Sequence, residues 1–413
     1  MMPTMAMELK VDTDAQEVGF DAGRLKRIDR HFARHVDEGE LPGWLIVVTR
    51  RGRVAHLSMC GHADIEAGRP VEVDTLWRIF SMTKPVTSVA AMMLFEEGTF
   101  DLTDPIARWL PEFTQPQVYV KGSALNPLTG PAIEPIRVWH LLTHTSGLTY
   151  GFHHAHPIDA MYRAAGFEWG TPPGLDLAGC VEQWARLPLV FQPGSEWNYS
   201  VSSDVLGRLV EVVSGQPLDE FFRQRIFAPL GMNDTSFGTE GENLAALYVP
   251  QPGTRKAVRH DAFGAAGRGR PDCLSGGGGL VSTAADYHRF TQFLLGRGEL
   301  EGVRLLSPRT VALMTSNHLP GDVDLEAYGR PLFAEMPFNG FGFGLGFSVL
   351  RDAVKAKTLS SPGEFAWGGA ASTAFWVDPA EELTAMFFTQ LMPSSTHPIR
   401  QHLRQLVYQA LVA

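Results

Sequence analysis

The tetrapeptide SMTK at residues 81–84 contains a pair, Ser81 and Lys84, whose types and spacing could support nucleophilic catalysis. Residues three apart in a helix lie on one face, so the hydroxyl and the amine would project side by side. An unprotonated lysine within hydrogen-bond reach of a serine can take its proton and activate it. None of the other six lysines follows a serine at this spacing. A serine followed by a lysine three residues later still occurs by chance about once in a few hundred positions. The pair therefore identifies a catalytic site only with support from elsewhere in the chain.

Pro85 indicates where the helix that carries this pair begins. Proline is tolerated in the first turn, because the N–H groups there have no acceptor within the helix. We therefore expect Ser81 near the helix N-terminus, with its own N–H unpaired and the positive end of the helix dipole beside it. Both features would stabilise an oxyanion formed when the serine attacks a carbonyl group.

The two ends of the chain have patterns that predict strands flanked by helices. Apolar residues at helical spacing in residues 20–38 predict a helix, and residues 43–61 read as two strands around a turn. Residues 397–413 predict a closing amphipathic helix. Before it, strand patterns occupy segments 342–350, 372–378 and 383–391, the last two joined by a hairpin turn. Both termini are thus expected to build one antiparallel sheet.

The middle of the chain, from Ser81 to about residue 230, has mainly helical patterns. Segment 203–214 has one apolar face, and Gly215 supplies a C-terminal stop. Segments 123–135 and 166–176 are rich in proline and glycine and are expected to lack regular structure. We predict a discontinuous sheet domain, residues 1–80 and 280–413, with a mainly helical domain, residues 81–279, inserted into it.

Composition excludes several classes of function. The chain has 413 residues, of which 44% are hydrophobic and 19% charged, as in a folded globular protein. A net charge of −10 with no basic run argues against nucleic-acid binding. No signal-peptide pattern and no membrane-length apolar segment is present, so we expect a cytoplasmic protein without membrane contact. The three cysteines have no paired spacing, and the oligomeric state stays open.

Five segments, in this order along the chain, resemble a known superfamily: LWRIFSMTKPVTSVAAMMLFEEGTFDLTDPIARWLP, IRVWHLLTHTSGL, FQPGSEWNYSVSSDVLGRLVEVVSGQPL, PLGMNDTSF and SGGGGLVSTAADYHRF. Together they resemble the serine β-lactamases and penicillin-binding proteins. More narrowly, the chain is similar to the class C β-lactamase-like esterases, called family VIII carboxylesterases, and to the related acyltransferase that acylates statin precursors. The resemblance spans about residues 20–410. It implies an α+β, β-lactamase/transpeptidase-like fold and a reaction that needs no metal or organic cofactor.

This resemblance implies roles for three residues. Ser81 matches the acylated serine of the S-x-x-K element, and Lys84 matches its lysine. Tyr199, in NYSV, matches the tyrosine of the Y-x-N element, whose phenol relays protons between the serine and the leaving group. From the residues alone, a tyrosine in a loop before a helix capped by Ser202 or Ser203 could also point into a cleft.

The third element of the family, K-T-G on a strand beside the serine, is matched by Trp367, Gly368 and Gly369. The two glycines would allow the backbone to approach a substrate closely. By position, the N–H of Ala370 would be the second oxyanion donor, beside that of Ser81.

Two departures from the family pattern point to the substrate. Trp367 replaces the lysine that binds the carboxylate of β-lactams, and Val201 replaces the asparagine that contacts their amide. Apolar replacements favour an uncharged ester or acyl thioester. Tyr150 and Phe152, together with Trp169, are candidates for lining the acyl or alcohol pocket. We therefore predict an esterase for small, short-chain esters. An acyltransferase, a β-lactamase or D-aminopeptidase, and a non-catalytic binding protein are the alternatives.

Other patterns that could signal a site are weaker. His153, His154 and His156 lack a helical i, i+4 pair and a nearby acidic residue, so we do not expect them to bind a metal. Ser146 lies in a stretch that reads as a helix end, and SGGGGL lacks the lysine of a phosphate-binding loop. The chain contains no G-x-S-x-G, which excludes an α/β-hydrolase nucleophile elbow.

Overall fold

The sheet joins the two ends of the chain. The computed structural model describes residues 9–330 and 337–412. Their main sheet has eight strands in the order β12-β13-β14-β15-β16-β1-β2-β3, and all pairs are antiparallel. The strands are β1 Gly43–Arg50, β2 Arg53–Asp64, β3 Arg69–Pro70, β12 Phe341–Phe343, β13 Ser348–Leu350, β14 Phe365–Gly368, β15 Ala374–Asp378 and β16 Leu383–Phe388. Because β1 pairs with β16, the first and last strands of the chain lie at the centre. The predicted α+β class, with an antiparallel sheet built from both ends of the chain, is confirmed.

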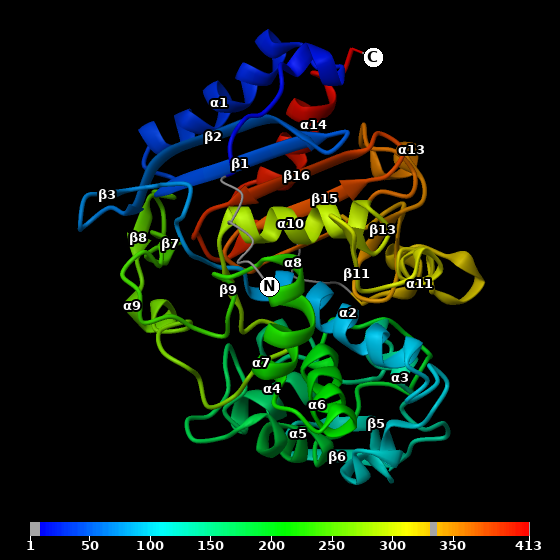
Figure 1. Ribbon diagram of the computed structural model, residues 1–413. Coiled ribbons are helices and arrows are strands. Elements are labelled where there is room, and N and C mark those ends of the chain that lie inside the picture. Colours follow the sequence, from blue (N-terminus) through cyan, green and yellow to red (C-terminus); the bar gives the residue numbers. More distant parts are fainter. Residues whose placement is uncertain (1–8, 331–336, 413) are drawn as a thin grey trace.

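Strand β1 is buried on both faces because helices cover each side of the sheet. Alternate side chains of a strand point to opposite faces. Ile46 and Val48 belong to a core shared with α1, Ala22–Asp37, and α14, Ile399–Tyr408. Leu45 and Val47 belong to a second core, which includes α2 and α10. Figure 1 shows α1 and α14 together on one side of the sheet and α10, Ala284–Leu295, on the other.

Helix α2, Thr83–Glu96, lies between the sheet and the helical part of the molecule. Its residues from Thr83 to Leu94 are all buried, as expected of a helix that is covered on every side. Helix α6, Ser202–Ser214, packs against α2 and ends at Gly215, whose φ of 70° is in the left-handed region. The other helices nearby are α3 Val138–Leu142, α4 Pro157–Ala164, α5 Leu177–Ala185, α7 Leu218–Phe222 and α8 Ala228–Leu230.

The remaining elements are short. Four two-stranded pairs are formed by β4 Trp77–Arg78 with β9 Val281–Ser282, β5 Gln117–Ser123 with β6 Asn126–Pro131, β7 Tyr248–Pro250 with β8 Ala257–Arg259, and β10 Glu299–Leu300 with β11 Val303–Arg304. The short helices are α9 Asp261–Gly264, α11 Pro308–Met314, α12 Leu325–Tyr328 and α13 Ala353–Ala356. The predicted domain boundaries, 1–80 with 280–413 and 81–279, stay a prediction.

Two predictions about local structure are wrong. Segment 123–135 was expected to be irregular, but it supplies β6 and the end of β5, which form an exposed hairpin. This segment is rich in proline and glycine, which is why a loop was expected, and the irregularity in the pairing of the two strands lies between Tyr119 and Lys121. Segment 342–350 was expected to be one strand, but it reverses at Gly346, φ 98°, and belongs to the two strands β12 and β13.

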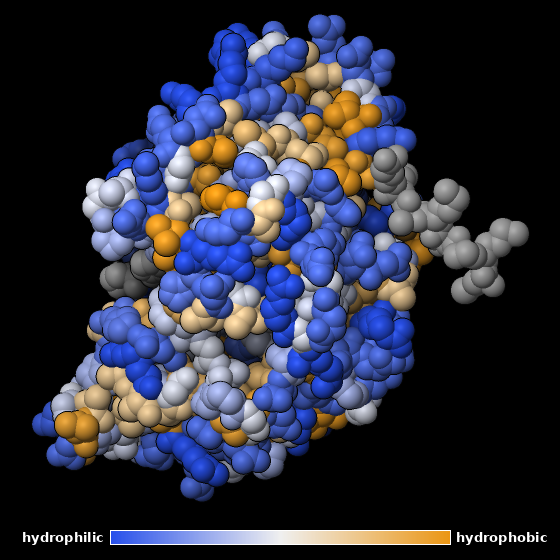
Figure 2. All heavy atoms as spheres, turned by 90° about the vertical axis from the view of Figure 1, so that its left-hand side faces the viewer, coloured by the Kyte–Doolittle hydropathy of each residue, from blue (hydrophilic) through white to orange (hydrophobic). Residues whose placement is uncertain are grey.

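On the face that Figure 2 shows, hydrophobic side chains gather in small separate groups among polar ones. Among the described residues, no helix has both the length and the apolar character needed to cross a bilayer.

The buried His288 is expected to make the fold sensitive to acid. On α10, His288 Nε2 lies 2.9 Å from Thr49 Oγ1 of β1, and burial, with Arg289 nearby, lowers the pKa of His288 from 6.5 to about 4. Between these pH values the unfolded chain binds the proton and the folded chain does not, so stability falls as the pH falls from 6.5 to 4.

We expect His288→Gln, which can keep the bond to Thr49, to reduce this loss of stability by up to about 3 kcal/mol. Urea unfolding at pH 7.0 and 4.5 measures it, with the exposed His62→Gln as the control. An unchanged pH dependence in His288→Gln would contradict the prediction.

Candidate active site

Ser81 lies in a short 3₁₀ turn, Phe80–Met82, that leads directly into α2. Phe80 has a φ of 43°, a left-handed conformation that costs a non-glycine residue about 1–3 kcal/mol. Lys84 follows in the first turn of α2, and its Nζ lies 3.1 Å from Ser81 Oγ. The prediction that Ser81 lies near a helix N-terminus, with Lys84 beside it, is confirmed.

Lys84 is enclosed by groups that leave its amine directed at the serine. Its side chain is buried, and Nζ lies 2.6 Å from the carbonyl oxygen of Gly277. The same Nζ lies 4.5 Å from the ring centroid of Tyr199 and 5.4 Å from that of Tyr150. Within the described chain, no carboxylate oxygen lies within 4.0 Å of this amine. A lysine without an ion-pair partner, in contact with a hydroxyl, is arranged as a base for that hydroxyl.

Asp204 positions the Gly277 carbonyl group, which accepts a hydrogen bond from Lys84. The sequence analysis did not identify Asp204. It lies buried on α6, where its Oδ1 accepts hydrogen bonds from Ser275 Oγ at 2.5 Å and from the Gly277 N–H at 3.0 Å. Burial raises the pKa of Asp204, and the nearby charge of Lys84 opposes this shift. A Cβ on Gly277 would lie 2.4 Å from Asp204 Oδ2, so this position requires glycine. Asp204 could have been noticed in the sequence, because it is an acidic residue in the buried part of the predicted helix 203–214.

Tyr199 lies in the segment before α6, with its ring against the Lys84 amine. The Trp367 Nε1–H donates to the Tyr199 hydroxyl at 3.3 Å, so strand β14 holds the phenol from the other side. His153 Nε2 lies 2.6 Å from the Tyr199 carbonyl oxygen and fixes the backbone. The phenol is therefore held between Lys84 and Trp367.

The predicted cap of α6 is wrong. The N-cap residue is Val201, and no side chain caps the helix. The Ser202 hydroxyl is instead 2.7 Å from Ser146 Oγ and 2.8 Å from Ser200 Oγ, all within the core. Ser146 belongs to the same buried network, and its hydroxyl does not face the cavity. This position agrees with the prediction that Ser146 lies at a helix end and is not part of the site.

The end of strand β14 runs against the segment that precedes Ser81. A Cβ on Gly369 would lie 2.2 Å from Thr373 Oγ1 and 2.5 Å from the carbonyl oxygen of Ile79, so the backbones touch here. A Cβ on Gly368 would lie 2.4 Å from the Arg400 guanidinium, which donates to the Gly369 carbonyl at 3.0 Å. Close approach of the backbone of Ile79 is thus the reason for Gly369, whereas Gly368 lies against the Arg400 side chain.

The Ser81 and Ala370 N–H groups have no hydrogen-bond acceptor among the residues that the structure describes. Both residues line the same cavity. Unpaired backbone donors at the wall of a cavity, one of them on the nucleophile itself, are what an oxyanion hole requires.

The cavity has a volume of about 480 Å³ and contains most of the predicted site residues. Ser81, Tyr150, Phe152, Tyr199, Val201, Trp367, Gly368, Gly369 and Ala370 line it, and Lys84 lies behind Ser81. Aromatic rings form one wall: Tyr150 stacks on Phe152 with centroids 4.6 Å apart, and Phe152 stacks on Trp169 at 4.8 Å. Burial raises the pKa of Tyr150 well above its ordinary value, which keeps this hydroxyl neutral. The structure therefore brings together every residue predicted for the site.

The three histidines of residues 153–156 point to different partners. His153 bonds to the Tyr199 backbone, and His156 accepts from the Ile158 N–H at the start of α4. His154 lies 3.3 Å from Glu168, an acidic neighbour that the sequence analysis did not foresee because it comes from a separate loop. The described residues of this loop form no group with metal-binding geometry.

Comparisons with known proteins decide the family. The model of the Beta-lactamase family matches residues 28–409. The chain belongs to the serine β-lactamase-like family. Within this family it is 33% identical to Esterase EstB of Burkholderia gladioli over 417 residues, which cover 96% of this chain and 98% of EstB.

Two solved structures of the serine β-lactamase-like family extend this comparison. EstCE1, described as a hydrolase with promiscuous acyltransferase activity, is 30% identical with a TM-score of 0.79, over 95% of this chain and 99% of EstCE1. Unliganded simvastatin synthase LovD from Aspergillus terreus is 25% identical with a TM-score of 0.77, over 94% and 98% of the two chains. These relatives support esterase or acyltransferase activity for this member of the serine β-lactamase-like family.

Proposed function

We propose that the protein is a carboxylesterase that hydrolyses small, short-chain esters through an acyl-enzyme on Ser81. The observation that carries the proposal is the 3.1 Å contact between Ser81 Oγ and the buried amine of Lys84, at the wall of an aromatic cavity. A nucleophile with its base in contact, beside unpaired N–H donors, supports acyl transfer from a carbonyl compound.

In the first half of the reaction, Ser81 Oγ attacks the ester carbonyl carbon and passes its proton to Lys84 Nζ. The Ser81 and Ala370 N–H groups bind the carbonyl oxygen as it becomes negative. The tetrahedral intermediate collapses, the bond to the alcohol oxygen breaks, and the proton reaches that oxygen from Lys84 by way of the Tyr199 hydroxyl. The alcohol leaves and an ester remains on Ser81.

In the second half, water takes the place of the alcohol. Tyr199 or Lys84 accepts a proton from the water as its oxygen attacks the acyl carbon. The bond to Ser81 Oγ breaks, and the serine regains a proton from the same groups. The acid leaves, and the enzyme returns to its starting state without a cofactor.

The character of the cavity supports an ester in place of a β-lactam. Trp367 presents an indole where the β-lactamases of this superfamily have a lysine, and Val201 presents an isopropyl group where they have an amide. Trp367 carries no positive charge and Val201 carries no amide, so neither reproduces the contacts that the lysine and the asparagine make with a substrate carboxylate and amide. A compact, uncharged acyl group would instead bury its surface against Tyr150 and Phe152.

Trapping the acyl-enzyme tests the proposal. The protein is mixed with 4-nitrophenyl esters of two to twelve acyl carbons, quenched in acid and weighed by mass spectrometry. We expect one acyl group per chain, located on Ser81 by fragmentation, with the shorter esters turned over fastest. Hydrolysis without any adduct on Ser81, or an adduct on another serine, would overturn it.

Acyl transfer to an alcohol is the second candidate, because EstCE1 is described as a hydrolase with promiscuous acyltransferase activity. The acyl-enzyme is the same, and the two activities differ only in the acceptor. Assaying the products with and without added primary and secondary alcohols distinguishes them. If an alcohol at millimolar concentration takes most of the acyl groups from 55 M water, the protein acts as an acyltransferase.

A further inference from the structure

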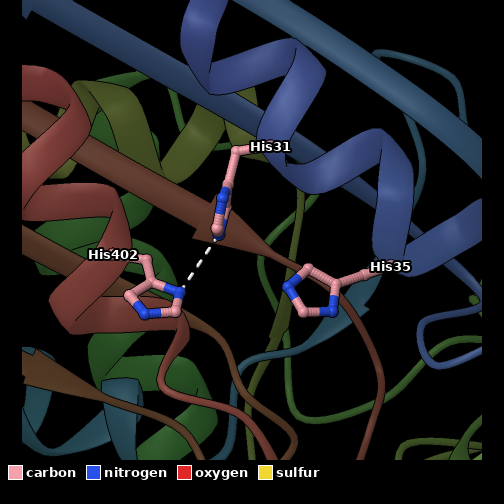
Figure 3. A group of neighbouring side chains, drawn as sticks. All are labelled: His31, His35 and His402. Carbon is pink, nitrogen blue, oxygen red and sulfur yellow. Dashed lines mark hydrogen bonds between the residues drawn. The ribbon is translucent and has the colours of Figure 1, made fainter.

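A group of histidines lies on the side of the sheet away from α2 and α10. His31 and His35 are four residues apart on α1, and His402 is on α14, which packs against α1. Figure 3 shows the three rings facing a common space between the two helices. All three side chains are half-buried. The proposed ester chemistry does not use them.

The ring nitrogens have the spacing of metal ligands. His31 Nε2 lies 3.0 Å from His402 Nδ1, and ligand atoms of all three residues lie within 4.8 Å of one another. Two nitrogens bound tetrahedrally to one zinc ion are about 3.3 Å apart. The distance between His31 Nε2 and His402 Nδ1 is therefore close to that between two zinc ligands. A small movement of His35 would bring a third ring nitrogen to a similar distance.

Glu40 orients His35 toward this space. His35 Nδ1 lies 2.6 Å from Glu40 Oε2, which holds the ring proton on Nδ1 and leaves the lone pair on Nε2. Figure 3 shows one ring nitrogen of His35 turned toward the other two histidines. A carboxylate behind a histidine, with the opposite nitrogen free, is the usual support of a metal-binding histidine.

The ring proton of His31 must change place before the ion can bind. His31 has to present the lone pair of Nε2 to the ion, so its proton has to lie on Nδ1. The Arg34 guanidinium donates to His31 Nδ1 at 2.9 Å. Because Arg34 is exposed, it can turn away when the His31 proton moves from Nε2 to Nδ1.

We propose that His31, His35 and His402 bind one divalent transition-metal ion, with Zn²⁺ as the best match, and that the ion joins the first and last long helices. Three imidazole nitrogens and one water complete a tetrahedral shell. The ion stabilises the fold and takes no part in ester hydrolysis.

Untagged protein, first stripped with EDTA, is titrated with ZnSO₄ in a calorimeter and melted with and without zinc. We expect one zinc per chain and a higher Tm, since an ion that binds only the folded chain stabilises it. Co²⁺ should give the visible absorption bands of a four-coordinate ion. No binding, or binding without a rise in Tm, would overturn the proposal.

Variants locate the ion. His31→Asn and His402→Gln should each weaken zinc binding by more than about 100-fold, and Glu40→Gln by about 10–100-fold. The exposed His62→Gln is the matched control and should bind as wild type does. Ester hydrolysis should be the same with and without EDTA.

A second group, formed by His35, Glu40 and His397, is the competing location. His397 Nδ1 lies 3.7 Å from Glu40 Oε2, and His397 is buried. If His397→Gln abolishes zinc binding while His402→Gln does not, the ion is held there and the proposed ligand set is wrong. Unchanged binding in His397→Gln supports the proposed set.

Discussion

Replacement of Ser81 by alanine is expected to lower kcat/KM for 4-nitrophenyl acetate by about 10³-fold or more. The substitution removes only the oxygen that attacks the carbonyl carbon. Lys84, Tyr199 and the cavity wall stay in place, so ester binding should persist while no acyl-enzyme forms. Steady-state rates and the intact mass of the protein after mixing with the ester measure both effects.

Ser88→Ala is the matched control for this variant. Ser88 lies on the same helix, α2, and is buried, but it does not line the cavity. We expect it to keep activity within a few-fold of wild type. If Ser81→Ala retains activity close to that of Ser88→Ala, Ser81 is not the nucleophile, whatever the protein hydrolyses.

Removal of the amine in Lys84→Met is expected to lower kcat/KM by about 10²–10⁴-fold, the scale of a lost acid–base group. Methionine keeps most of the buried volume, so the effect reports the amine and not a cavity. Because Lys84 Nζ contacts Ser81 Oγ, acylation should slow most. Stopped-flow release of 4-nitrophenolate should therefore lose its initial burst.

An exposed lysine provides the comparison for Lys84. Lys121 lies on strand β5, away from the cavity, and Lys121→Met should leave both the burst and the steady-state rate unchanged. A Lys84→Met protein that folds and still gives a full burst would assign the base to another group, of which Tyr199 is the nearest.

The parts of the fold and site that could be predicted are those set by local spacing or by motif order. Helix α1, the β1–β2 hairpin, helix α6 with its glycine stop, and the β15–β16 hairpin follow from residue periodicity and turn residues. The contact of Ser81 with Lys84 follows from their separation of three on a helix. Tyr199 and Trp367 could be chosen only through the resemblance to a family, because they come from distant segments.

The parts that could not be predicted depend on contacts between distant segments. The Gly277 carbonyl reaches Lys84 because Asp204 on α6 holds its loop, and no local pattern relates residues 204 and 277. His31 and His35 have a visible i, i+4 spacing, but their third partner, His402, depends on how α14 packs against α1. The β5–β6 hairpin was missed because its proline and glycine content favours a loop.

The pairing of β1 with β16 determines when the enzyme can become active during synthesis. Leu45 pairs with Phe388, so β1, which is made early in translation and can pair at once with β2, has no partner on its other edge until β16 has been translated. The Ser81–Lys84 turn can form as soon as its own helix does, but Gly369 and Ala370, which face it, are translated much later. Pairing over such sequence separation is slow and leaves strand edges exposed. Until β14 to β16 have been translated and have paired, we expect the nascent chain to lack the Ala370 N–H donor and to leave one edge of β1 exposed to aggregation.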